Sequence, residues 1–408
     1  MTRADFFLNK NREQFFERGL LLFIAMIFIG FIGSRALISI GVACLLVLGI
    51  FNFFSANAKI PYSSYVLLIP VFFFLPFLYS FFYSENTGQW LSWLLLKLPF
   101  LVLPIAFWLL PPISEKVIAK ILKVYILLMV ISSGVFLFRY IQHFQQINES
   151  FFSGGRMPVP FSHIRYSLLL VFAFFATIWL YINSYKKWLL FVWAYLFIAI
   201  HILSVRSGLL SLYVGLAFTV VYFSFKTRQW KLILGMTLSA IIIGWLSFTF
   251  APSLQNRISY MRYDYSQWQI GKIDGNSDAM RLASLKTGVE LFKKNIWFGV
   301  GTGDILKESK EMSRQLFPTV VSEESRKMPH NEFLWTLSST GIIGMIFFLM
   351  AWLLPLWLFK SRTTYIGLIF HLVMAVSFMV EYTLEEQVGG TLFMLFSMLF
   401  LKRMSAEV

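Results

Sequence analysis

The residues best suited to chemistry are His330 and Asn331, which stand where a polar stretch ends and about 27 mostly apolar residues begin. If the apolar run forms a transmembrane helix, both residues lie where that helix meets water. Imidazole is the one side chain that ordinarily titrates near neutral pH, and the start of a helix gathers electropositive backbone N–H groups. His330 is therefore a candidate general acid or base, and a role limited to capping the helix is the alternative.

Four arginines form a second group with chemical potential. Arg35, Arg165 and Arg206 each lie at the end of an apolar run, and Arg281 opens an amphipathic stretch. Guanidinium groups that converge at a membrane surface offer permanently charged, two-pronged donors for phosphate and need no metal ion. They indicate a site for a lipid phosphate or pyrophosphate. The alternative for each arginine is that it extends to lipid headgroups or pairs with a nearby acid.

The composition identifies the elements that must position these residues. The chain has 58% hydrophobic, 19% aromatic and only 13% charged residues, with a mean hydropathy of +0.70. A soluble chain carries about 25% charged residues, so the sequence predicts an all-α polytopic integral membrane protein. Cys44 is the only cysteine and lies in an apolar run, which excludes an internal disulfide and a cysteine-based metal cluster.

Twelve apolar runs are long enough to span the hydrocarbon layer. We expect one integrated membrane domain, with nine spans in residues 1–250, an outer segment at 251–329 and three spans in residues 330–408. The expected spans are residues 19–34, 36–54, 64–83, 90–110, 117–138, 166–183, 188–205, 208–225, 231–250, 332–359, 364–380 and 387–401. The charged amino end lacks a small-residue cleavage site, so it is typical of a cytoplasmic tail and not of a signal peptide.

The distribution of Lys and Arg predicts the orientation. With twelve spans and the amino end inside, seventeen basic residues lie in cytoplasmic segments and five in the short outer connections. Cytoplasmic loops collect Lys and Arg, so both termini are expected on the cytoplasmic side and the long segment at 251–329 on the outer side. The net charge of +15 then reflects orientation and anionic membrane lipids, with no nucleic-acid partner.

The outer segment contains a predicted amphipathic helix at residues 278–296. Its apolar residues recur at helical spacing, which predicts that this face lies against the membrane domain. These apolar residues are Leu282, Leu285, Val289, Phe292 and Ile296. The helix is followed by Gly299-Val300-Gly301-Thr302-Gly303, which does not match a phosphate-binding P-loop and is interpreted as a hinge.

The order of these features resembles the O-antigen ligase and polymerase superfamily. Its signature is similar to His330-Asn331 followed, after nine residues, by Gly341-x-x-Gly344. An arginine at the outer end of an earlier span, an arginine-led helix ending in a glycine-rich turn, and a large outer segment before the histidine agree with it. The resemblance covers roughly residues 162–408.

The resemblance implies a metal-independent glycosyltransferase without a cofactor, in the bacterial cytoplasmic (inner) membrane. Such an enzyme takes a glycan from undecaprenyl pyrophosphate on the periplasmic face and passes it to an acceptor hydroxyl, in a ligase that of lipid A core. The equivalents of Arg206 and Arg281 are thought to hold the pyrophosphate, and the equivalent of His330 to assist the acceptor. Membrane lipids and the two glycan substrates are the expected partners.

Other polar residues are expected to support this site. Glu332 could orient His330, although an acid is also favoured in the first turn of a helix. His163 and Arg165 could line the same cavity, and Lys97, inside a predicted span, must face a cavity or extend to the interface. Three acids between the last two spans are expected to form the cavity wall or to pair with the arginines. These acids are Glu381, Glu385 and Glu386.

Three other functions remain open from the sequence. Within the superfamily, the chain could polymerise glycan repeat units or glycosylate a protein; one long outer segment, where polymerases often have two, favours a ligase. A transporter of lipid-linked glycan predicts internal repeats and a charge at the middle of the membrane. The sequence shows no repeat, and its polar groups gather at the outer ends of the spans. A purely structural membrane protein would not require arginines at the outer ends of its spans.

Overall fold

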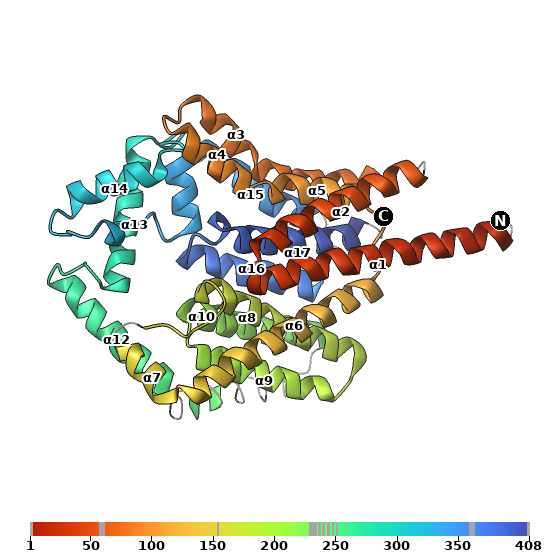
Figure 1. Ribbon diagram of the computed structural model, residues 1–408, viewed down its shortest axis with the longest axis horizontal. Helices are drawn as coiled ribbons and strands as arrows, with labels where there is room; N and C mark the ends of the chain where they lie inside the picture. The colour runs from red at the N-terminus through yellow and green to blue at the C-terminus, as the bar shows by residue number, and fades with distance from the viewer. Residues whose placement is uncertain are drawn as a thin grey trace.

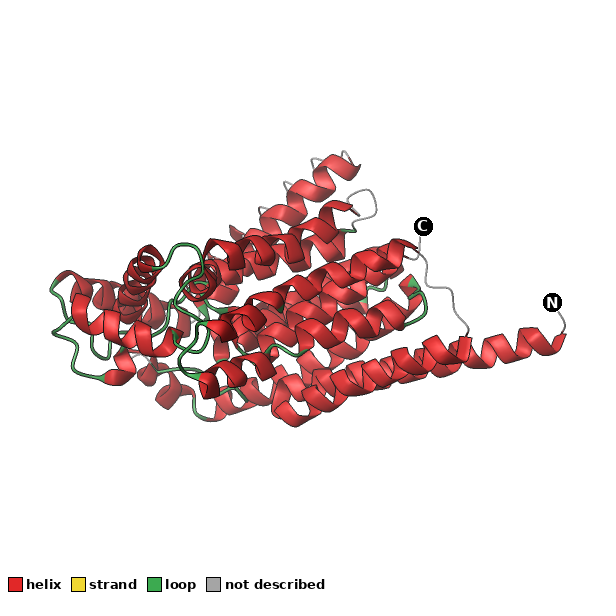
Figure 2. Cartoon of the chain, turned by 90° about the horizontal axis from the view of Figure 1, so that it is seen from above, coloured by secondary structure: helices red, strands yellow, loops and turns green. Residues whose placement is uncertain are grey.

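The computed structural model describes residues 3–56, 62–152, 155–227, 252–358 and 364–405, with isolated positions between 235 and 249. Throughout these described residues the regular structure is helical, with no strand, as Figure 1 and Figure 2 show. Long apolar helices lie side by side along the longest axis of the molecule, and shorter polar helices cross one end of them. The all-α polytopic fold predicted from composition is therefore confirmed.

Nine helical segments in the described residues are long and apolar enough to cross a membrane, and α9 and α16 are shorter apolar helices. The membrane helices are α1 (Arg3–Gly33), α2 (Arg35–Ala56), η1 (Tyr62–Phe73) with α3 (Leu75–Tyr79) and η2 (Ser80–Phe82), α4 (Thr87–Leu96) with α5 (Pro99–Leu109), α6 (Glu115–Gln142), α8 (His163–Ser184), α9 (Trp188–Leu203), α10 (Arg206–Thr227), α15 (Glu332–Leu358), α16 (Tyr365–Val380) and α17 (Gln387–Ser405). Eleven predicted spans fall on these elements. The span predicted at 231–250 lies almost entirely outside the described residues, so the number twelve stays a prediction.

The third and fourth predicted spans are not continuous α-helices. The third is a 3-10 helix (η1) that contains Pro70 and is followed by the short α3, with Pro76 in its first turn. Proline lacks the backbone N–H that an α-helix needs and interrupts the regular pattern. The fourth breaks between α4 and α5, where Lys97 ends the first helix and Pro99 opens the second. This break places the ammonium group of Lys97 inside the protein.

The helices α8 and α17 form the centre of the bundle. Almost every side chain of both is buried, in contrast to α1, α2 and α15, whose outward faces carry exposed large hydrophobic residues. A helix that is apolar on all sides belongs in the interior, and one with an exposed apolar stripe suits a lipid-facing position. One end of α17, at Gln387, lies near the candidate site, and the other end, at Arg403, pairs with Glu115 of α6.

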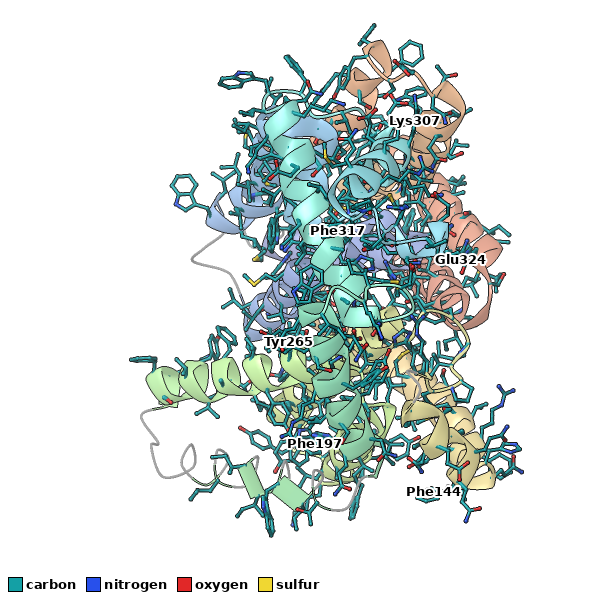
Figure 3. All side chains as sticks on the ribbon, turned by 90° about the vertical axis from the view of Figure 1, so that its left-hand side faces the viewer. Phe144, Phe197, Tyr265, Lys307, Phe317 and Glu324 are labelled. Carbon is teal, nitrogen blue, oxygen red and sulfur yellow. The ribbon has the colours of Figure 1, made fainter. Side chains whose placement is uncertain are left out.

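Three polar helices between α10 and α15 cross one end of the bundle. They are α12 (Pro252–Gln269), α13 (Ser277–Lys294) and α14 (Ile305–Leu316), and the short η3 (Glu323–Ser325) follows them. α12 packs against α7 (Phe144–Phe152), and α13 packs against α15. Figure 3 looks at this end, with Tyr265 on α12 and Lys307 on α14 labelled.

The helix predicted at 278–296 is present as α13, but the face predicted to contact the protein is wrong. Val289 and Ile296 are exposed, whereas Ala283, Ser284 and Gly288 are buried. A Cβ added at Gly288 would meet the side chains of Pro329 and Leu334. The small residues therefore let α13 approach the start of α15 closely, which the larger Leu and Val side chains would prevent.

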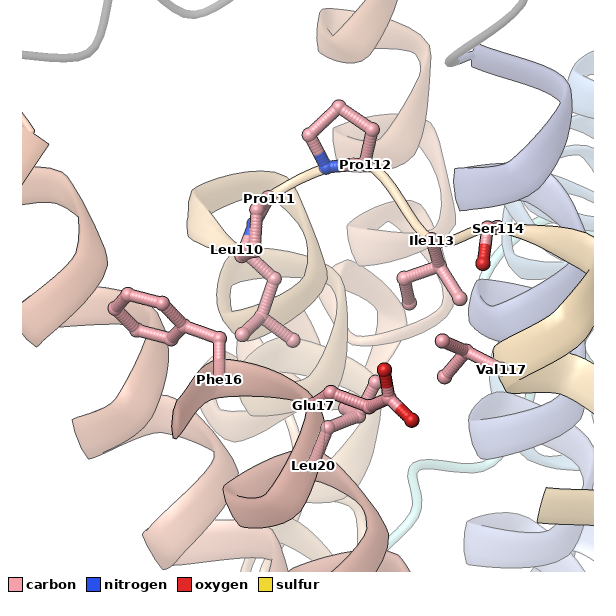
Figure 4. Close-up of a pocket in the computed structure, with 9 residues that line it drawn as sticks. All are labelled: Phe16, Glu17, Leu20, Leu110, Pro111, Pro112, Ile113, Ser114 and Val117. Atoms are coloured by element: carbon pink, nitrogen blue, oxygen red, sulfur yellow. The ribbon is translucent and has the colours of Figure 1, made fainter. Parts of the chain in front are cut away.

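The opposite end of the bundle has a cavity of about 350 Å³ between α1 and the connection from α5 to α6 (Figure 4). Its lining is mostly apolar, and its only carboxylate, Glu17, pairs with Lys120. The lining residues are Phe16, Glu17, Leu20, Leu110, Pro111, Pro112, Ile113, Ser114 and Val117. No group in this lining matches the chemistry expected from the sequence.

Candidate functional site

Asn331 caps α15 and fixes its start. Its side-chain oxygen accepts a hydrogen bond from the backbone N–H of Leu334 at 2.9 Å, and its carbonyl accepts one from Trp335 at 2.8 Å. Its side-chain amide donates to the carbonyl of Met379, at the end of α16, at 2.8 Å. Asn331 thus performs the capping that was the alternative role for His330, and the imidazole is left for another task.

His330 is oriented by α13 and by its own backbone neighbourhood. The Ser284 hydroxyl accepts the His330 backbone N–H at 3.2 Å, and His330 Nδ1 lies 3.1 Å from the carbonyl oxygen of Met328. Because a carbonyl can only accept, the neutral ring carries its proton on Nδ1 and leaves the Nε2 lone pair unprotonated. The side chain is 13% exposed, and Nε2 lies 3.9 Å from Oε1 of Glu381, which is 3% exposed.

Three of the four arginines expected to bind phosphate are paired with an acid. Arg281 lies 3.5 Å from Oε2 of Glu381, and Arg206 at the start of α10 pairs with Asp278 at the start of α13. Carboxylate and phosphate groups both bind guanidinium through two parallel hydrogen bonds. A bound phosphate could therefore take the place of the carboxylate beside each arginine. The side chains of Arg206 and Arg281 are 25% and 31% exposed, so a ligand can reach them.

Arg165 is held more tightly. It lies 3.0 Å from Glu386 and donates to the carbonyl of Tyr382 at 3.1 Å, and its side chain is buried. The structure therefore brings this arginine to the same cluster, but its contacts support the segment at residues 381–386. Through that segment Arg165 acts on the position of Glu381.

The cluster converges on Glu381. This carboxylate reaches Arg281 with one oxygen and His330 with the other, and Arg165, Arg281 and Arg156 all act on it electrostatically. The groups come from α8, α10, α13, the start of α15 and the connection between α16 and α17, which lie far apart in sequence. We call these residues the outer-end cluster: Arg156, Arg165, Arg206, Arg281, His330, Asp278, Glu381 and Glu386.

The electrostatics of the cluster favour an anion. Four guanidinium groups face three carboxylates, which leaves one positive charge in excess. Burial, and next the positive charge of Arg281, lower the pKa of His330 to about 3. Lys327 and Arg165 lower it further, against the hydrogen bond to Met328. The imidazole is therefore neutral at pH 7, and an anion that neutralises the arginines would raise its basicity.

Two predicted residues are placed differently from the rest. Arg35 opens α2 and is exposed, its carbonyl accepts a hydrogen bond from Gln387 at 3.2 Å, and among the described residues its side chain forms no ion pair. His163 is the first residue of α8, two positions before Arg165, and is half-buried. The structure thus places both on the same end of the bundle. It joins Arg281 and His330 through Glu381, and it pairs Arg206 with Asp278 and Arg165 with Glu386.

Glu332 does not orient His330, contrary to the expectation. It is fully buried, and its Oε2 accepts the backbone N–H of Leu384 at 2.8 Å. Its side chain turns away from the imidazole toward Lys97 and Glu385. Lys97 lines a small cavity of about 20 Å³, which was one of the two expectations for it, and there it forms a buried ion pair with Glu385 at 2.6 Å.

The structure explains why glycine occupies the signature positions 341 and 344. Gly341 has a φ of 66°, which breaks α15, and a Cβ there would overlap the carbonyl of Trp297. The freed backbone groups bond to the turn after α13, with Ile342 N–H donating to Ile296 and Val300 N–H donating to Ser338, both at 2.9 Å. Gly344 packs beside the Tyr79 hydroxyl.

The turn predicted as a hinge is instead a fixed joint. Residues 299–303 are all buried, and Gly299 has a φ of 69° with no room for a Cβ against the backbone of Ser339. Asp304, at the end of the turn, accepts the backbone N–H groups of Glu85 and Asn86 at 2.7 and 3.0 Å. We call this contact between residues 296–304 and the break in α15 the glycine joint.

Several cluster residues were not singled out from the sequence as ligands. The acids at 381–386 were expected to be possible partners of the arginines, and the pairs of Glu381 and Glu386 confirm this. Asp278, Ser284 and Arg156 were not expected. The sequence signal that could have identified Arg156 was its position in a short outer connection. In the part of the chain that the structure describes, no carboxylate lies within ion-pair distance of Arg156.

Residues 190–349 match a family model described as O-Antigen ligase. The chain contains an O-antigen ligase-type domain. This ligase-type domain includes Arg206, Arg281, His330 and both signature glycines, while Arg165 and Glu381 lie outside the matched residues. No curated protein matches the chain. With its apolar helices, the chain is a multi-pass membrane protein. The family that residues 190–349 match consists of glycosyltransferase-like enzymes.

Proposed function

We propose that this ligase-type protein transfers a glycan from undecaprenyl pyrophosphate to an acceptor hydroxyl, as an O-antigen ligase acting on lipid A core. The observation that supports this most is that His330 and Arg281 share one buried carboxylate, Glu381. Arg206 pairs with Asp278 at the start of α13, the helix that carries Arg281, and Arg206, Arg281 and His330 all lie in the matched family region. The site combines an anion-binding part with a neutral base, which are the two parts that such a transfer requires.

Arg206 and Arg281 hold the donor pyrophosphate in this proposal. Both are partly exposed, and both are paired with carboxylates that a pyrophosphate can replace. Exposed Arg156 adds a third guanidinium at the entrance. When the bond between the sugar and the pyrophosphate breaks, negative charge grows on the leaving oxygen, and fixed positive groups stabilise it without reorganisation. The arginines supply this charge, so no metal ion or cofactor is required.

His330 receives the proton of the acceptor. The acceptor oxygen attacks the anomeric carbon, the carbon–oxygen bond to the pyrophosphate breaks, and the leaving group departs with the electron pair. The acceptor proton passes to Nε2 of His330, and the carboxylate of Glu381 stabilises the imidazolium. General-base assistance of this kind contributes about 10² to 10⁴ in rate. Donor binding raises the basicity of His330 because it neutralises Arg281, whose charge lowers the pKa of the free site.

The expected location follows from the same proposal. We place the outer-end cluster on the periplasmic face of the bacterial inner membrane, with both termini in the cytoplasm, as the distribution of Lys and Arg predicts. The segment at 251–329 that carries Arg281 then lies in the periplasm. A donor whose lipid stays in the membrane and whose pyrophosphate lies at the interface can reach arginines at the ends of α8 and α10.

The test uses purified protein in detergent, with a chelator, a labelled undecaprenyl-pyrophosphate glycan and lipid A core as acceptor. The proposal predicts that the wild type transfers the glycan to the core. His330→Ala should transfer it at least 100-fold more slowly than the wild type and should still bind the donor. Extension of the donor glycan without acceptor would identify a polymerase. Donor binding or transbilayer movement without transfer by the wild type would refute the glycosyltransferase and favour a transporter.

A further inference from the structure

A buried charge cluster lies behind the site, formed by Lys97, Glu332 and Glu385, which are 2%, 1% and 3% exposed. Lys97 Nζ lies 2.6 Å from Oε1 of Glu385 and donates to the carbonyl of Leu384 at 2.7 Å. Glu332 Oε2 accepts the backbone N–H of the same Leu384 at 2.8 Å. Leu384 is thus held on both of its backbone polar groups. The mechanism proposed above uses none of these three side chains.

The charges of this cluster balance only if it holds one proton. One lysine cannot neutralise two buried carboxylates, and two carboxylates at close range do not both ionise. Glu332 and Glu385 line the same small cavity and act on one another electrostatically, so one of the two carboxyl groups keeps its proton. The triad is then neutral overall, with Lys97 charged, one carboxylate ionised and one carboxyl protonated.

An aromatic cage surrounds the ammonium group. Lys97 Nζ lies 5.0 Å from the ring centre of Phe77, 5.1 Å from that of Phe100 and 5.8 Å from that of Trp335. Rings at these distances attract a cation through their faces. The cage and the break between α4 and α5 fix the ammonium group in one place. Apolar side chains of similar volume often stabilise a protein as well as a buried ion pair does, so stability alone gives no reason for a lysine here.

The cluster connects the two halves of the active site. Glu332 is two residues after His330, at the start of α15. Leu384 and Glu385 belong to η5 (Thr383–Glu385), in the segment that begins with Glu381 and ends with Glu386. Glu381 contacts both His330 and Arg281, and Glu386 contacts Arg165. Among the described residues, the hydrogen bonds from the end of α4 to this segment run through Lys97 to Leu384 and Glu385.

We propose that Lys97 is a positioning residue for the transfer reaction: together with Glu332 and Glu385 it fixes Leu384, and thereby sets the place of Glu381 against His330 and Arg281. This inference rests on the proposed function. Lys97 does not touch the substrate, so its removal affects the transfer step and leaves the exposed arginines to bind the donor. A displacement of about 1 Å at a catalytic group lowers a rate by about 100-fold, which sets the scale of the effect.

The test compares Lys97→Met, the charge-balanced double variant Lys97→Met with Glu385→Gln, and Glu385→Gln. In the double variant Glu332 alone remains, and it can stay protonated, so the fold is not left with an unpaired buried charge. We expect kcat about 10- to 100-fold lower in Lys97→Met and in the double variant, with an unchanged donor KM. Glu385→Gln removes the ion pair but keeps the bond from Lys97 to the Leu384 carbonyl, so its loss of kcat is expected to be smaller than that of Lys97→Met.

Lys402→Met is the matched control. Lys402 is also buried and lies in α17, at the end of the bundle away from the site. Among the described residues, its ammonium group has only the Trp108 carbonyl, at 3.5 Å, as a hydrogen-bond partner. Its kcat per folded protein should equal that of the wild type. Wild-type kcat in the folded double variant would overturn the positioning role and leave the glycosyltransferase intact. A raised donor KM with unchanged kcat would also overturn it, whereas absent transfer by the wild type would refute the proposed function itself.

Discussion

Replacement of Glu381 by Gln tests the outer-end cluster most directly. The change keeps the size of the side chain and removes the charge that faces Nε2 of His330 at 3.9 Å and Arg281 at 3.5 Å. In the transition state His330 becomes an imidazolium. Two opposite unit charges at that separation interact with about 4 kcal/mol at an effective dielectric constant of about 20. Because Arg281 already shares the carboxylate, this figure is an upper bound on the loss.

The expected result is a fall in kcat of about 10²- to 10³-fold, since each 1.4 kcal/mol is about a factor of ten. The donor KM should stay the same or decrease, because Arg281 is released from its acid and becomes fully available to the pyrophosphate. The assay is transfer of labelled glycan by purified protein, at several donor concentrations. Glu386→Gln is the matched control: it lies in the same segment and pairs with Arg165, but it does not contact His330. A kcat for Glu381→Gln within threefold of the wild type, or equal losses in both variants, would refute this reasoning.

Three further predictions follow from the site and the glycine joint. Burial lowers the pKa of His330 to about 3 in the folded protein, so below about pH 6.5 the unfolded chain binds more protons and the free energy of unfolding falls as pH falls. This one histidine costs about 2 kcal/mol of stability between pH 7 and pH 5. His330→Gln should remove that part of the loss, which thermal unfolding in detergent at both pH values would measure. Gly341→Ala should destabilise the protein by about 1 to 3 kcal/mol in the same assay, because its φ of 66° and its backbone contact exclude a Cβ, whereas Gly88→Ala, in the open first turn of α4, should not. Arg206→Gln and Arg281→Gln should each weaken pyrophosphate binding about 10- to 100-fold by calorimetry, and an unchanged affinity would exclude them as ligands.

The sequence predicted the membrane helices, and it selected the candidate site residues, for clear physical reasons. Apolar runs in the described part of the chain appear as helices because a lipid environment leaves few alternatives for the backbone. His330, Arg206 and Arg281 were identifiable because polar and charged residues at span ends are costly unless they have a role. Their convergence could not be predicted, because it depends on how α8, α10, α13 and α15 pack.

The errors have a common origin in packing at close range. The predicted face of α13 followed hydrophobicity, but the helix packs through Ala283, Ser284 and Gly288, since small residues allow the closest approach. Glu332 follows His330 closely in sequence, yet the turn of α15 directs it into the interior toward Lys97. The glycine-rich turn was expected to flex, because the sequence does not show that its backbone bonds to the break in α15.

The glycine joint also constrains the order in which the protein is assembled. The break at Gly341 interrupts the hydrogen bonds within α15. The backbone N–H groups of Ile342 and Ile343 instead donate to the carbonyls of Ile296 and Trp297. Unsatisfied backbone groups are costly in a membrane. Residues 296–301 leave the ribosome before α15 does, so the partner for the break is already made when α15 inserts. Once α15 is complete, these bonds hold the turn that follows the Arg281 helix against the helix that begins beside His330.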